Sequence, residues 1–475
     1  MNVVIAIGII LLILNAAFAF SLIFIERKDP TTTWAWLLIF ALLPGIGFLI
    51  YVLIGQNFSR QKLFTEKRIK DVNKKKELNK VLGDSGHDGG EQFKDLRRMN
   101  YNNCGARYTI GNDVDIFVNG EDKFKKLLED IKNAKEYIHM EYYIFRKDGI
   151  GKDIVDALEE KLAEGVEVRL LVDSMGSYTI TKKKLKRFLE LGGRFAIFFP
   201  GLLPHINTRI NFRNHRKIVV IDGEYGYVGG FNVGDEYVNR DKKIGFWRDT
   251  HIRIRGMAVN DLNERFLLDW CYAAREELED FSTFLPKEEF KGGDVGVQII
   301  TSGPDHNEEY IKNAYIKLIN NAKQNVFITS PYFVPDAPIL EAIRIAALSG
   351  VDVRLLIPGK PDHMFMKWAA DSYLGELFTA GVRVYYYRRG FVHAKTIVVD
   401  SSVVSIGTAN MDIRSFSLNF EVNAFIFDEG KAKECEEDFR NDLDGSVEVT
   451  MEMFESRPKR VRIVESLVRL VSPIL

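Results

Sequence analysis

The string HRKIVVID at residues 215–222 recurs as HAKTIVVD at residues 393–400. In both copies a lysine follows the histidine by two positions and an aspartate follows it by seven, which gives the spacing HxKxxxxD. One copy alone would be weak evidence, but two copies in register predict a duplicated unit made of two fused halves. Fourteen positions after each histidine stands a glycine, and three positions later an asparagine, namely Gly229 and Asn232 in the first copy and Gly407 and Asn410 in the second.

Other strings repeat in the same order around these two anchors. GVEVRLLV from Gly165 resembles GVDVRLLI from Gly350, and an alanine-lysine pair precedes each, at Ala134 and at Ala322. Apolar periodicity predicts that helices and strands alternate in both halves. The sequence therefore indicates an α/β fold, in which each half is a β-sheet flanked by helices and a pseudo-twofold axis relates the halves.

The predicted helices and strands occur in the same order in the two halves. We expect these halves to span residues 108–283 and 284–475. In the first half they are a helix over 122–136, a strand over 137–145, a helix over 154–163, a strand over 166–173 and a hairpin over 217–230. In the second half they are a helix over 310–321, a strand over 326–333, a helix over 339–348, a strand over 351–358 and strands over 395–400 and 403–408.

Two long stretches without a charged residue lie near the N-terminus, at residues 2–25 and 34–54. Each reaches the roughly 20 residues that a helix needs to cross the apolar core of a bilayer. A polar turn separates them, so we expect residues 1–58 to form a transmembrane hairpin. The alternative is a signal peptide with an A-x-A site at Ala17 and Ala19, but no basic segment precedes the apolar run.

We expect residues 59–107 to form a basic juxtamembrane segment and linker. Residues 60–80 contain nine lysines and arginines against three acidic residues, which places the bulk of the protein on the cytoplasmic side. The basic run is either a solvated surface or a contact with anionic lipid headgroups. The string GDSGHDGG at residues 83–90 predicts a flexible connection.

The composition excludes some classes of function. The formal net charge is -1, so the chain lacks the overall positive field of a nucleic-acid-binding protein. Three widely separated cysteines, Cys104, Cys271 and Cys435, have no ligand spacing and are expected to be structural thiols in a reducing compartment. No group of Asp, Glu and His has the spacing of a metal site, so we expect neither a metal nor another cofactor.

The two motifs carry the chemistry. Residues two positions apart in a strand point to the same face, so the histidine and lysine of each motif should lie on one side. The aspartate is an odd number of positions away and should face the other side beside a turn, where it supports the fold. If a pseudo-twofold axis relates the halves, two histidines and two lysines converge on one cleft. The candidate catalytic residues are His215, Lys217, Asp222, His393, Lys395 and Asp400.

Such a cleft suits a phosphodiester. The two ammonium groups, helped by the side-chain amides of Asn232 and Asn410, can bind its non-bridging oxygens and stabilise the charge of the transition state. One imidazole can attack phosphorus to form a phosphohistidine while the other protonates the leaving alcohol. The reverse steps with a new alcohol complete a transfer, and no metal is needed.

The nucleophilic histidine must be neutral and oriented, which usually takes a carboxylate at its other ring nitrogen. Glu421, in FSLNFEVN, is placed after the second motif for this role. In the first half Asp249, in FWRDTH, is the best candidate and Glu236 the second.

The paired motifs resemble those of the phospholipase D superfamily, whose mark is HxKxxxxD followed by Gly and Asn at this spacing. Further strings make nearly the whole chain similar to the bacterial cardiolipin synthase family. They are the N-terminal RKDPTTTWAWLLIFALLPGIGFLIYVLIG, then EYYIF, RLLVDSMGS, GFNVGDEY, FWRDTH, TSPYFVPD, ANMDIRSFSLNFEVN and the terminal RLVSPIL.

This resemblance implies a transphosphatidylation at the cytoplasmic membrane of a bacterium. One phosphatidylglycerol gives its phosphatidyl group to a histidine, glycerol leaves, and a second phosphatidylglycerol accepts the group to form cardiolipin. The resemblance also implies that His215 is the nucleophile and His393 the acid and base, and that Thr408 and Glu421 match residues used by the family. The first copy departs from that pattern with Gly230 and has no carboxylate at the matching spacing, so the group that orients His215 stays open.

Other functions remain open at this point. A hydrolytic phospholipase D differs only in its acceptor, and a transferase can take another polyol or an amino alcohol. A nuclease of the superfamily is disfavoured by the two apolar stretches and by the balanced charge. A non-catalytic membrane scaffold predicts loss of a motif histidine or lysine, whereas both motifs are intact.

Two further segments each have two interpretations. The stretch from Gly192 to His215 is eleven residues longer than its counterpart in the second half. This apolar insertion near residues 199–209 is either a lid facing lipid or a surface loop. The tail over 456–475 is basic and amphipathic, which suits a membrane surface or a helix docked on the core. Tyr332 and Trp247 lie in matching strings and are either site residues or packing residues.

Overall fold

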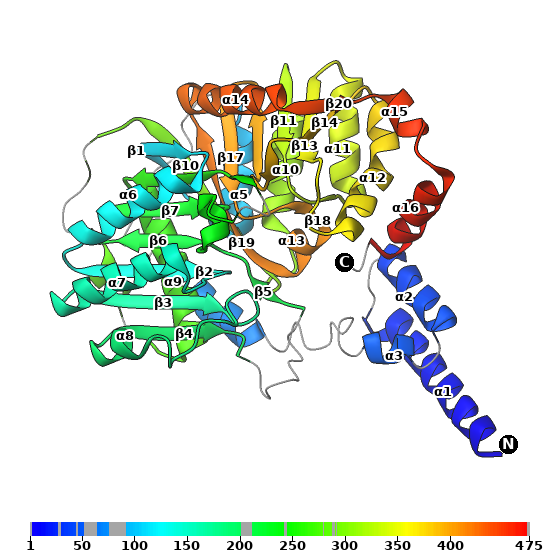
Figure 1. Cartoon of the computed structure of the whole chain (residues 1–475), viewed down its shortest axis with the longest axis horizontal. Helices are drawn as coiled ribbons and strands as arrows, with labels where there is room; N and C mark the ends of the chain where they lie inside the picture. The colour runs from blue at the N-terminus through cyan, green and yellow to red at the C-terminus, as the bar shows by residue number, and fades with distance from the viewer. Residues whose placement is uncertain are drawn as a thin grey trace.

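The computed structural model describes residues 2–26, 30–43, 46–51, 64–75, 92–200, 211–241, 245–278, 280–286, 290 and 292–472. In Figure 1 the two halves lie side by side, the first in cyan and green and the second in yellow to red. The N-terminal helices, in dark blue, project away from both halves.

Within the described residues, both halves contribute to one continuous sheet of 16 strands. From its centre outward the first half supplies β1 (Tyr108–Phe117), β9 (His251–Arg255), β7 (Tyr225–Gly229), β6 (Ile218–Ile221), β2 (Tyr137–Tyr142), β3 (Glu167–Asp173) and β4 (Arg194–Phe198). In the matching order the second half supplies β10 (Val295–Ser302), β19 (Asn419–Phe427), β17 (Val403–Gly407), β16 (Thr396–Val399), β11 (Asn325–Thr329), β13 (Asp352–Pro358) and β14 (Arg383–Tyr387), with β20 (Ser446–Val449) beyond it. The expected α/β fold with two repeated halves is confirmed.

The two halves meet where β1 pairs with β10 in antiparallel register, with Tyr108 opposite Gln298. Short strands also pair across the boundary. β5 (Arg213–Asn214) lies parallel to β19, and β15 (Gly390–Val392) lies parallel to β8 (Phe246–Arg248). Because β5 and β15 end directly before the two motif histidines, these pairings bring each motif against the opposite half.

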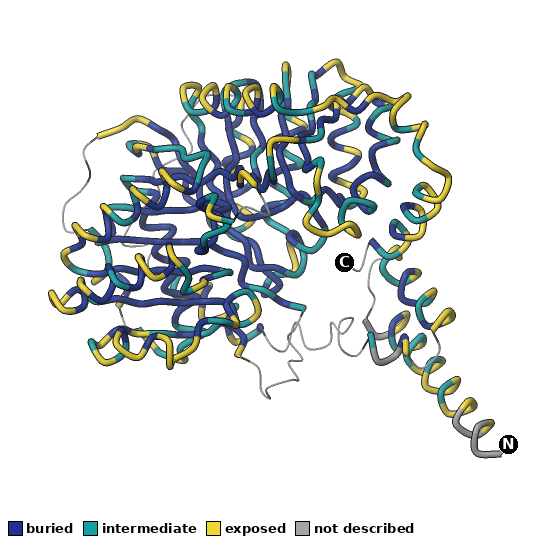
Figure 2. The backbone as a smooth tube through the Cα atoms, in the orientation of Figure 1, coloured by how far each residue is buried: buried dark blue, intermediate teal, exposed yellow. Residues whose placement is uncertain are grey.

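Helices cover the sheet, and in Figure 2 they carry most of the exposed backbone while the strands between them are buried. In the first half these are α6 (Gly120–Asn133), α7 (Gly149–Ala163), α8 (Lys186–Glu190), η3 (Asp235–Val238), α9 (Ala258–Ala274) and η4 (Phe281–Phe284). The second half has α10 (Tyr310–Asn320), α11 (Ala337–Leu348), α12 (Met364–Thr379), α13 (Ile413–Ser417), α14 (Glu429–Asp444), α15 (Met451–Glu455) and α16 (Lys459–Val471), with strands β12 (Phe333–Val334) and β18 (Met411–Asp412). Helix α5 (Lys94–Cys104) packs against α10 and β10.

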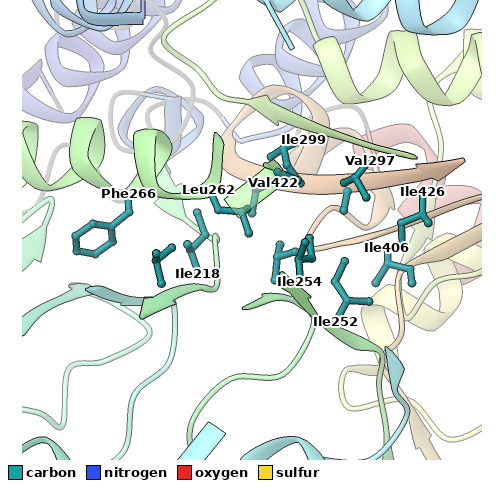
Figure 3. Close-up of a cluster of buried hydrophobic side chains, with 14 of the residues drawn as sticks. Ile218, Ile252, Ile254, Leu262, Phe266, Val297, Ile299, Ile406, Val422 and Ile426 are labelled. Atoms are coloured by element: carbon teal, nitrogen blue, oxygen red, sulfur yellow. The ribbon is translucent and has the colours of Figure 1, made fainter. Parts of the chain in front are cut away.

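Helix α9 lies at the centre of the largest apolar core. Each of its residues from Ala258 to Trp270 is buried. Figure 3 shows Leu262 and Phe266 of this helix in the same cluster as Ile218 of β6. The cluster also contains residues of β10 and β19, so the core is continuous between the halves.

The aspartate that closes each motif binds the backbone at the start of a neighbouring strand. The carboxylate of Asp222 accepts hydrogen bonds of 2.8 to 2.9 Å from the backbone N–H groups of residues 135–137. The carboxylate of Asp400 accepts equivalent bonds from residues 323–325. Both aspartates have a positive φ, 55° and 52°, which is the left-handed conformation that Asp tolerates in tight turns.

Most elements predicted from the sequence form within a few residues of their expected limits. The helix predicted over 122–136 is α6, and the strand predicted over 166–173 is β3. The motif strands begin three residues after their histidines, at Ile218 and Thr396. The prediction that each histidine and lysine is part of the strand was therefore wrong, because both stand in the segment that leads into it.

The N-terminal helices are α1 (Asn2–Phe20), the π-helical turn η1 (Ser21–Glu26), α2 (Pro30–Leu42) and α3 (Ile46–Ile50). They share a small core of Leu22, Trp36, Phe40 and Tyr51. Among the described residues, the structure contains no helix with both the length and the apolar character needed for a membrane crossing. The expected transmembrane hairpin is thus not shown.

Residues 64–75 form a helix that docks on the two halves. Phe64 is buried and packs edge-on against Phe199, Phe212 and Phe420. Lys67 is also buried, although the sequence predicted that the basic run faces either solvent or lipid headgroups. For this residue both interpretations were wrong, because acidic side chains from the halves surround it.

Helix α16 packs on α12 and buries Glu465 and Val468. Its opposite side exposes Ile463, Leu467 and Leu470. The docked interpretation of the tail therefore holds for one face of this helix. The predicted flexible connection at 83–90 and residues 201–210, which include most of the insertion, lie outside the described residues.

Candidate active site

Backbone contacts between the halves position the two motif histidines. The N–H of His215 donates to the carbonyl oxygen of Phe420 in β19 at 2.9 Å. The N–H of His393 donates to the carbonyl oxygen of Arg248 in β8 at 2.6 Å. Each histidine is therefore held against the half to which it does not belong.

The carboxylates that bind the imidazoles are exchanged between the halves. Nδ1 of His215 lies 3.0 Å from both carboxylate oxygens of Glu421. Nδ1 of His393 lies 2.6 Å from Oδ2 of Asp249. Glu421, named for its place after the second motif, therefore binds the first-half histidine, and Asp249, the first-half candidate, binds the second-half histidine. Glu236, the second candidate, pairs instead with Arg146 at 2.7 Å.

Chain spacing hides the equivalence of the two carboxylates. Asp249 follows its own motif histidine by 34 positions and Glu421 follows its own by 28. The two carboxylates nevertheless occupy equivalent places in the sheet. In each half, the carbonyl oxygen of the residue after the carboxylate accepts a hydrogen bond from the N–H of the residue that follows the motif glycine. Gly230 donates to the oxygen of Thr250, and Thr408 donates to the oxygen of Val422. The first half therefore has the carboxylate that its spacing seemed to lack.

Gly230 and Thr408 differ because their neighbouring carboxylates differ. A Cβ atom at Gly230 would lie 1.9 Å from Oδ1 of Asp249, so no side chain fits there. In the second half the hydroxyl of Thr408 accepts a bond of 2.9 Å from the backbone N–H of Val422. The same hydroxyl helps to lower the pKa of Glu421. Each half thus positions, with its own residues, the carboxylate that binds the histidine of the other half.

Both carboxylates are held in the charged form. Burial opposes ionisation, but His215 and Lys217 hold the pKa of Glu421 below its ordinary value. Likewise Lys395 and His393 outweigh burial and lower the pKa of Asp249. A charged carboxylate can only accept, so it keeps the imidazole proton on Nδ1 and leaves the Nε2 lone pair available.

Burial favours the neutral form of both histidines. Burial lowers the pKa of His215, with Glu421 opposing it. Burial and the charge of Lys395 lower the pKa of His393 to about 4. The lysine of each half also lowers the pKa of the other half's histidine, which places the two motifs in one electrostatic site.

The two motif lysines are buried within this site. Burial lowers the pKa of Lys217 to about 7 and that of Lys395 to about 8. The ammonium of Lys217 donates to the carbonyl oxygen of His215 at 2.7 Å, and that of Lys395 donates to the carbonyl oxygen of His393 at 2.5 Å. A bound anion would stabilise the charged form of both.

The two motif asparagines are buried but have different contacts. Oδ1 of Asn232 accepts a bond of 3.1 Å from the backbone N–H of Ile144. Oδ1 of Asn410 is buried without a hydrogen-bond partner among the described residues. An unsatisfied buried amide oxygen is costly, so Asn410 is the asparagine better placed to rearrange around a ligand.

Aromatic rings stand beside both histidines. The ring centres of Tyr143 and His215 are 4.9 Å apart, and those of Trp247 and His393 are 5.0 Å apart. The hydroxyl of Tyr332 donates to Asp362. Tyr143 was not predicted as a site residue, because the sequence placed it within the strand expected over 137–145.

The arrangement provides two neutral imidazoles, each with Nδ1 occupied by an ionised carboxylate, and two lysines with lowered pKa. One imidazole can act as a nucleophile while the other exchanges a proton. The lysines supply positive charge for a tetrahedral anion.

Comparisons with known proteins agree with this geometry. A family model described as "Cardiolipin synthase, PLD-like domain" matches residues 127–270 and 315–443, and one described as "Phospholipase_D-nuclease N-terminal" matches residues 13–56. A cardiolipin synthase of Clostridium perfringens is 52% identical over 461 residues, which cover 95% of this chain and 96% of the relative. The major cardiolipin synthase of Bacillus subtilis is 49% identical, with 98% of each chain covered.

Among solved structures, phosphatidylserine synthase of Haemophilus influenzae aligns with a TM-score of 0.60 and 17% identity. The alignment covers 80% of this chain and 100% of that one, which supports the fold. The matched family models and the two relatives cover both motifs. This chain therefore belongs to the cardiolipin synthase family of the phospholipase D superfamily.

Proposed function

We propose that the chain is a phosphatidyltransferase that makes cardiolipin from two molecules of phosphatidylglycerol. The observation that carries the proposal is the exchange of carboxylates between the halves. It gives one site two oriented imidazoles of matched chemistry, as a transfer through a covalent intermediate requires. The curated relatives that share nearly the whole chain are cardiolipin synthases, and this supports the choice of substrate.

In the first half-reaction Nε2 of His215 attacks the phosphorus of phosphatidylglycerol. The bond between phosphorus and the glycerol headgroup oxygen breaks, and His393 gives that oxygen a proton, so glycerol leaves. A phosphodiester anion in the site raises the pKa of His393 and so favours the protonated form that this step needs. The enzyme is left with a phosphatidyl group on His215.

In the second half-reaction a headgroup hydroxyl of another phosphatidylglycerol enters. His393 takes its proton, the hydroxyl oxygen attacks phosphorus, and the bond between phosphorus and Nε2 of His215 breaks. Cardiolipin leaves and both imidazoles return to their starting state. Lys217, Lys395, Asn232 and Asn410 bind the phosphoryl oxygens during both steps. Asp222 and Asp400 fix the ends of the motif strands to the starts of the neighbouring strands β2 and β11.

We also propose that residues 1–58 hold the enzyme at the membrane as a two-helix hairpin, with the halves on the cytoplasmic side. The support is the exposure of large apolar side chains there, including Leu12, Ile13, Trp34 and Leu42, each more than half exposed. Such a surface is unfavourable in water. The lipid substrates reside in the same membrane, which makes encounter between two of them efficient.

The test of the transferase uses membranes that contain the wild-type chain and phosphatidylglycerol labelled in its headgroup. We expect one free glycerol for each cardiolipin formed, with turnover abolished in His215→Ala and in His393→Ala. Phosphatidic acid as the main product would instead make the enzyme a hydrolase. Absence of any product from wild type would favour the scaffold.

The assignment of His215 as the nucleophile has its own test. After acid quenching with acyl-labelled substrate, the lipid label is expected on the wild-type chain and should map to a peptide containing His215. Label on a peptide containing His393 would reverse the two roles.

The membrane proposal is tested by washing membranes at alkaline pH. The full chain is expected to stay in the membrane pellet, and a chain beginning at residue 59 is expected to be released. Release of the full chain by the same wash would contradict a spanning hairpin.

A further inference from the structure

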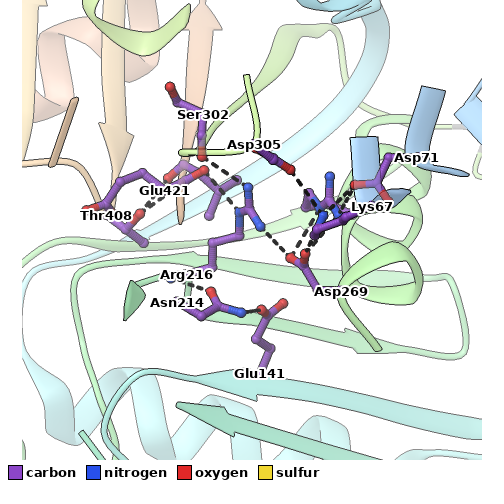
Figure 4. Close-up of polar contacts among 12 residues, drawn as sticks. Lys67, Asp71, Glu141, Asn214, Arg216, Asp269, Ser302, Asp305, Thr408 and Glu421 are labelled. Carbon is purple, nitrogen blue, oxygen red and sulfur yellow. Dashed lines mark hydrogen bonds and ion pairs between the residues drawn. The ribbon is translucent and has the colours of Figure 1, made fainter. Parts of the chain in front are cut away.

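A buried group of charges that the proposed reaction does not use connects the helix at 64–75 with both halves (Figure 4). Lys67 lies 2.5 Å from Asp71, 3.2 Å from Asp305 and 3.4 Å from Asp269. Arg265 of α9 lies 3.0 Å from Asp71 and 2.8 Å from Asp269. We call this group the linker ion cluster, and its members are Lys67, Asp71, Arg216, Arg265, Asp269 and Asp305.

The cluster is balanced, with three lysine or arginine cations facing three carboxylates. Burial opposes the charge of Lys67, but its three carboxylate neighbours raise the pKa of this ammonium above its ordinary value. In the same way Lys67 and His306 outweigh burial and hold the pKa of Asp305 well below its ordinary value. Every member has a side chain no more than 9% exposed, so loss of one charge leaves an uncompensated charge away from water.

Arg216 connects the linker ion cluster with the active site. It stands between His215 and Lys217, and its Nη1 lies 2.5 Å from Oδ2 of Asp269. Its Nε donates to the backbone oxygen of Glu421 at 3.1 Å. Glu421 is the carboxylate that holds His215, so one guanidinium connects the motif, β19 and α9.

A second contact connects the helix at 64–75 with the backbone that holds His215. Phe64 packs on the ring of Phe420, and the ammonium of Lys67 lies 5.4 Å from the centre of that ring. The backbone oxygen of Phe420 accepts the N–H bond of His215. The helix at 64–75 therefore touches Phe420 directly and is linked to Glu421 through Asp269 and Arg216, yet it follows the N-terminal helices in the chain.

We propose that Lys67 is a positioning residue for the pair formed by His215 and Glu421, so that catalysis depends on the seating of the helix that leads from the N-terminal segment. By balancing Asp269 and Asp305, Lys67 keeps Arg216 bonded to Asp269 and to the backbone of Glu421. The proposal rests on the proposed function, in which His215 forms the covalent intermediate. Lys67 acts through Arg216 and does not touch the substrate.

The test compares Lys67→Met with Lys70→Met in the full chain, reconstituted in vesicles that contain phosphatidylglycerol. Methionine keeps most of the length of lysine and removes its charge. Lys70 is a matched control, because it lies on the same helix but pairs at the surface with Glu277, with side chains 67% and 81% exposed. All assays are made well below the Tm of each variant, so that unfolding does not limit the rate.

For Lys67→Met we expect kcat for cardiolipin formation to fall roughly 10- to 100-fold with KM nearly unchanged, because the imidazole is displaced while the phosphate-binding lysines stay in place. Lys70→Met and Lys67→Arg should keep kcat within about twofold of wild type. A folded Lys67→Met variant with wild-type kcat, or one in which KM rises instead, would overturn the proposal.

If Lys67→Met fails to fold, the double variant Lys67→Met/Asp305→Asn replaces it. It restores the balance, with two arginines facing two carboxylates, and is expected to recover both stability and most of kcat. A stable double variant in which kcat stays as low as in a Glu421→Gln variant contradicts the charge argument. Wild-type enzyme that makes phosphatidic acid but no cardiolipin counts against the proposed function alone, and the same comparison is then made on hydrolysis.

Discussion

At the scale of single residues, the two imidazole–carboxylate pairs are the most consequential contacts of the site. Glu421→Gln and Asp249→Asn each remove the charge that keeps a histidine oriented and its proton on Nδ1. We expect either change to lower kcat roughly 10²- to 10⁴-fold while KM changes little. Steady-state rates of cardiolipin formation measure this.

The control for that prediction is Glu236→Gln. Glu236 was the alternative orienting residue, but it pairs with Arg146, whose side chain is 44% exposed. Its loss should leave kcat close to wild type. A large loss of kcat in Glu236→Gln, or wild-type kcat in Glu421→Gln, would contradict the assignment of the pairs.

The motif lysines predict how substrate affinity depends on pH. In the empty site the pKa of Lys217 is lowered to about 7 and that of Lys395 to about 8. A phosphodiester anion favours the ammonium form, so binding is strongest below these values and weakens as the pH rises through them. We expect KM for phosphatidylglycerol to rise roughly tenfold or more between about pH 7 and about pH 9.

Mixed micelles at constant ionic strength allow this measurement. Lys395→Arg stays charged over the whole range, so its KM should depend less steeply on pH than that of wild type. A wild-type KM that stays flat above about pH 8 would show that the lysines remain charged in the empty site.

The candidate site residues could be recognised from the sequence because the duplicated spacing names them twice. Their pairing could not. It depends on β5 and β15 crossing to the opposite half, and each crossing is only two or three residues long. Spacing along the chain also hid the equivalence of Asp249 and Glu421, since a longer connection separates Asp249 from its motif than separates Glu421 from its own.

At the scale of elements, the docking of α16 predicts that two adjacent residues contribute differently to the stability of the fold. Val468 is 6% exposed and faces α12, whereas Leu467 is 59% exposed. Val468→Ser is expected to lower stability by about 2 kcal/mol through lost apolar burial, and Leu467→Ser by less than about 0.5 kcal/mol. Thermal unfolding of both variants measures the difference. Equal losses of stability would contradict the docking of α16 on α12.

Helices with one buried face were predictable, and the helix buried on all sides was not. Helix α6 alternates apolar and charged positions, so its period is visible in the sequence. Helix α9 is buried from Ala258 to Trp270 and includes Asn260, Asp261 and Glu264, so neither its composition nor its period indicates a core helix. The central strands β1 and β10 were missed as well, because their pairing joins residues about 190 positions apart.

At the scale of the whole molecule, a buried carboxyl group predicts how stability depends on pH. Glu264 lies in the central helix α9, its Oε1 has no hydrogen-bond partner among the described residues, and burial raises its pKa from 4.5 to about 7. Between these values the folded chain binds a proton that the unfolded chain has lost. Stability from this group therefore falls as the pH rises from about 4.5 to about 7 and stays lower above it.

The substitution Glu264→Gln removes the loss of stability that ionisation of this carboxyl group causes. We expect the variant to be more stable than wild type at about pH 8, by on the order of 3 kcal/mol at most, and equal to it at about pH 4. Denaturant unfolding at the two pH values provides the comparison. A variant less stable than wild type at about pH 8 would mean that Glu264 has a compensating partner.

The contact between Gly230 and Asp249 has a consequence for the history of a duplicated gene. Recombination between tandem copies of a gene segment tends to replace the sequence of one copy with that of the other. Here a conversion tract that carried the second copy's threonine to position 230 would place a side chain where Asp249 stands, since even a Cβ atom there lies 1.9 Å from its Oδ1. His393 in the other copy would then lose its carboxylate. Such an event would inactivate the enzyme, so the two repeats are free to diverge only as a matched pair.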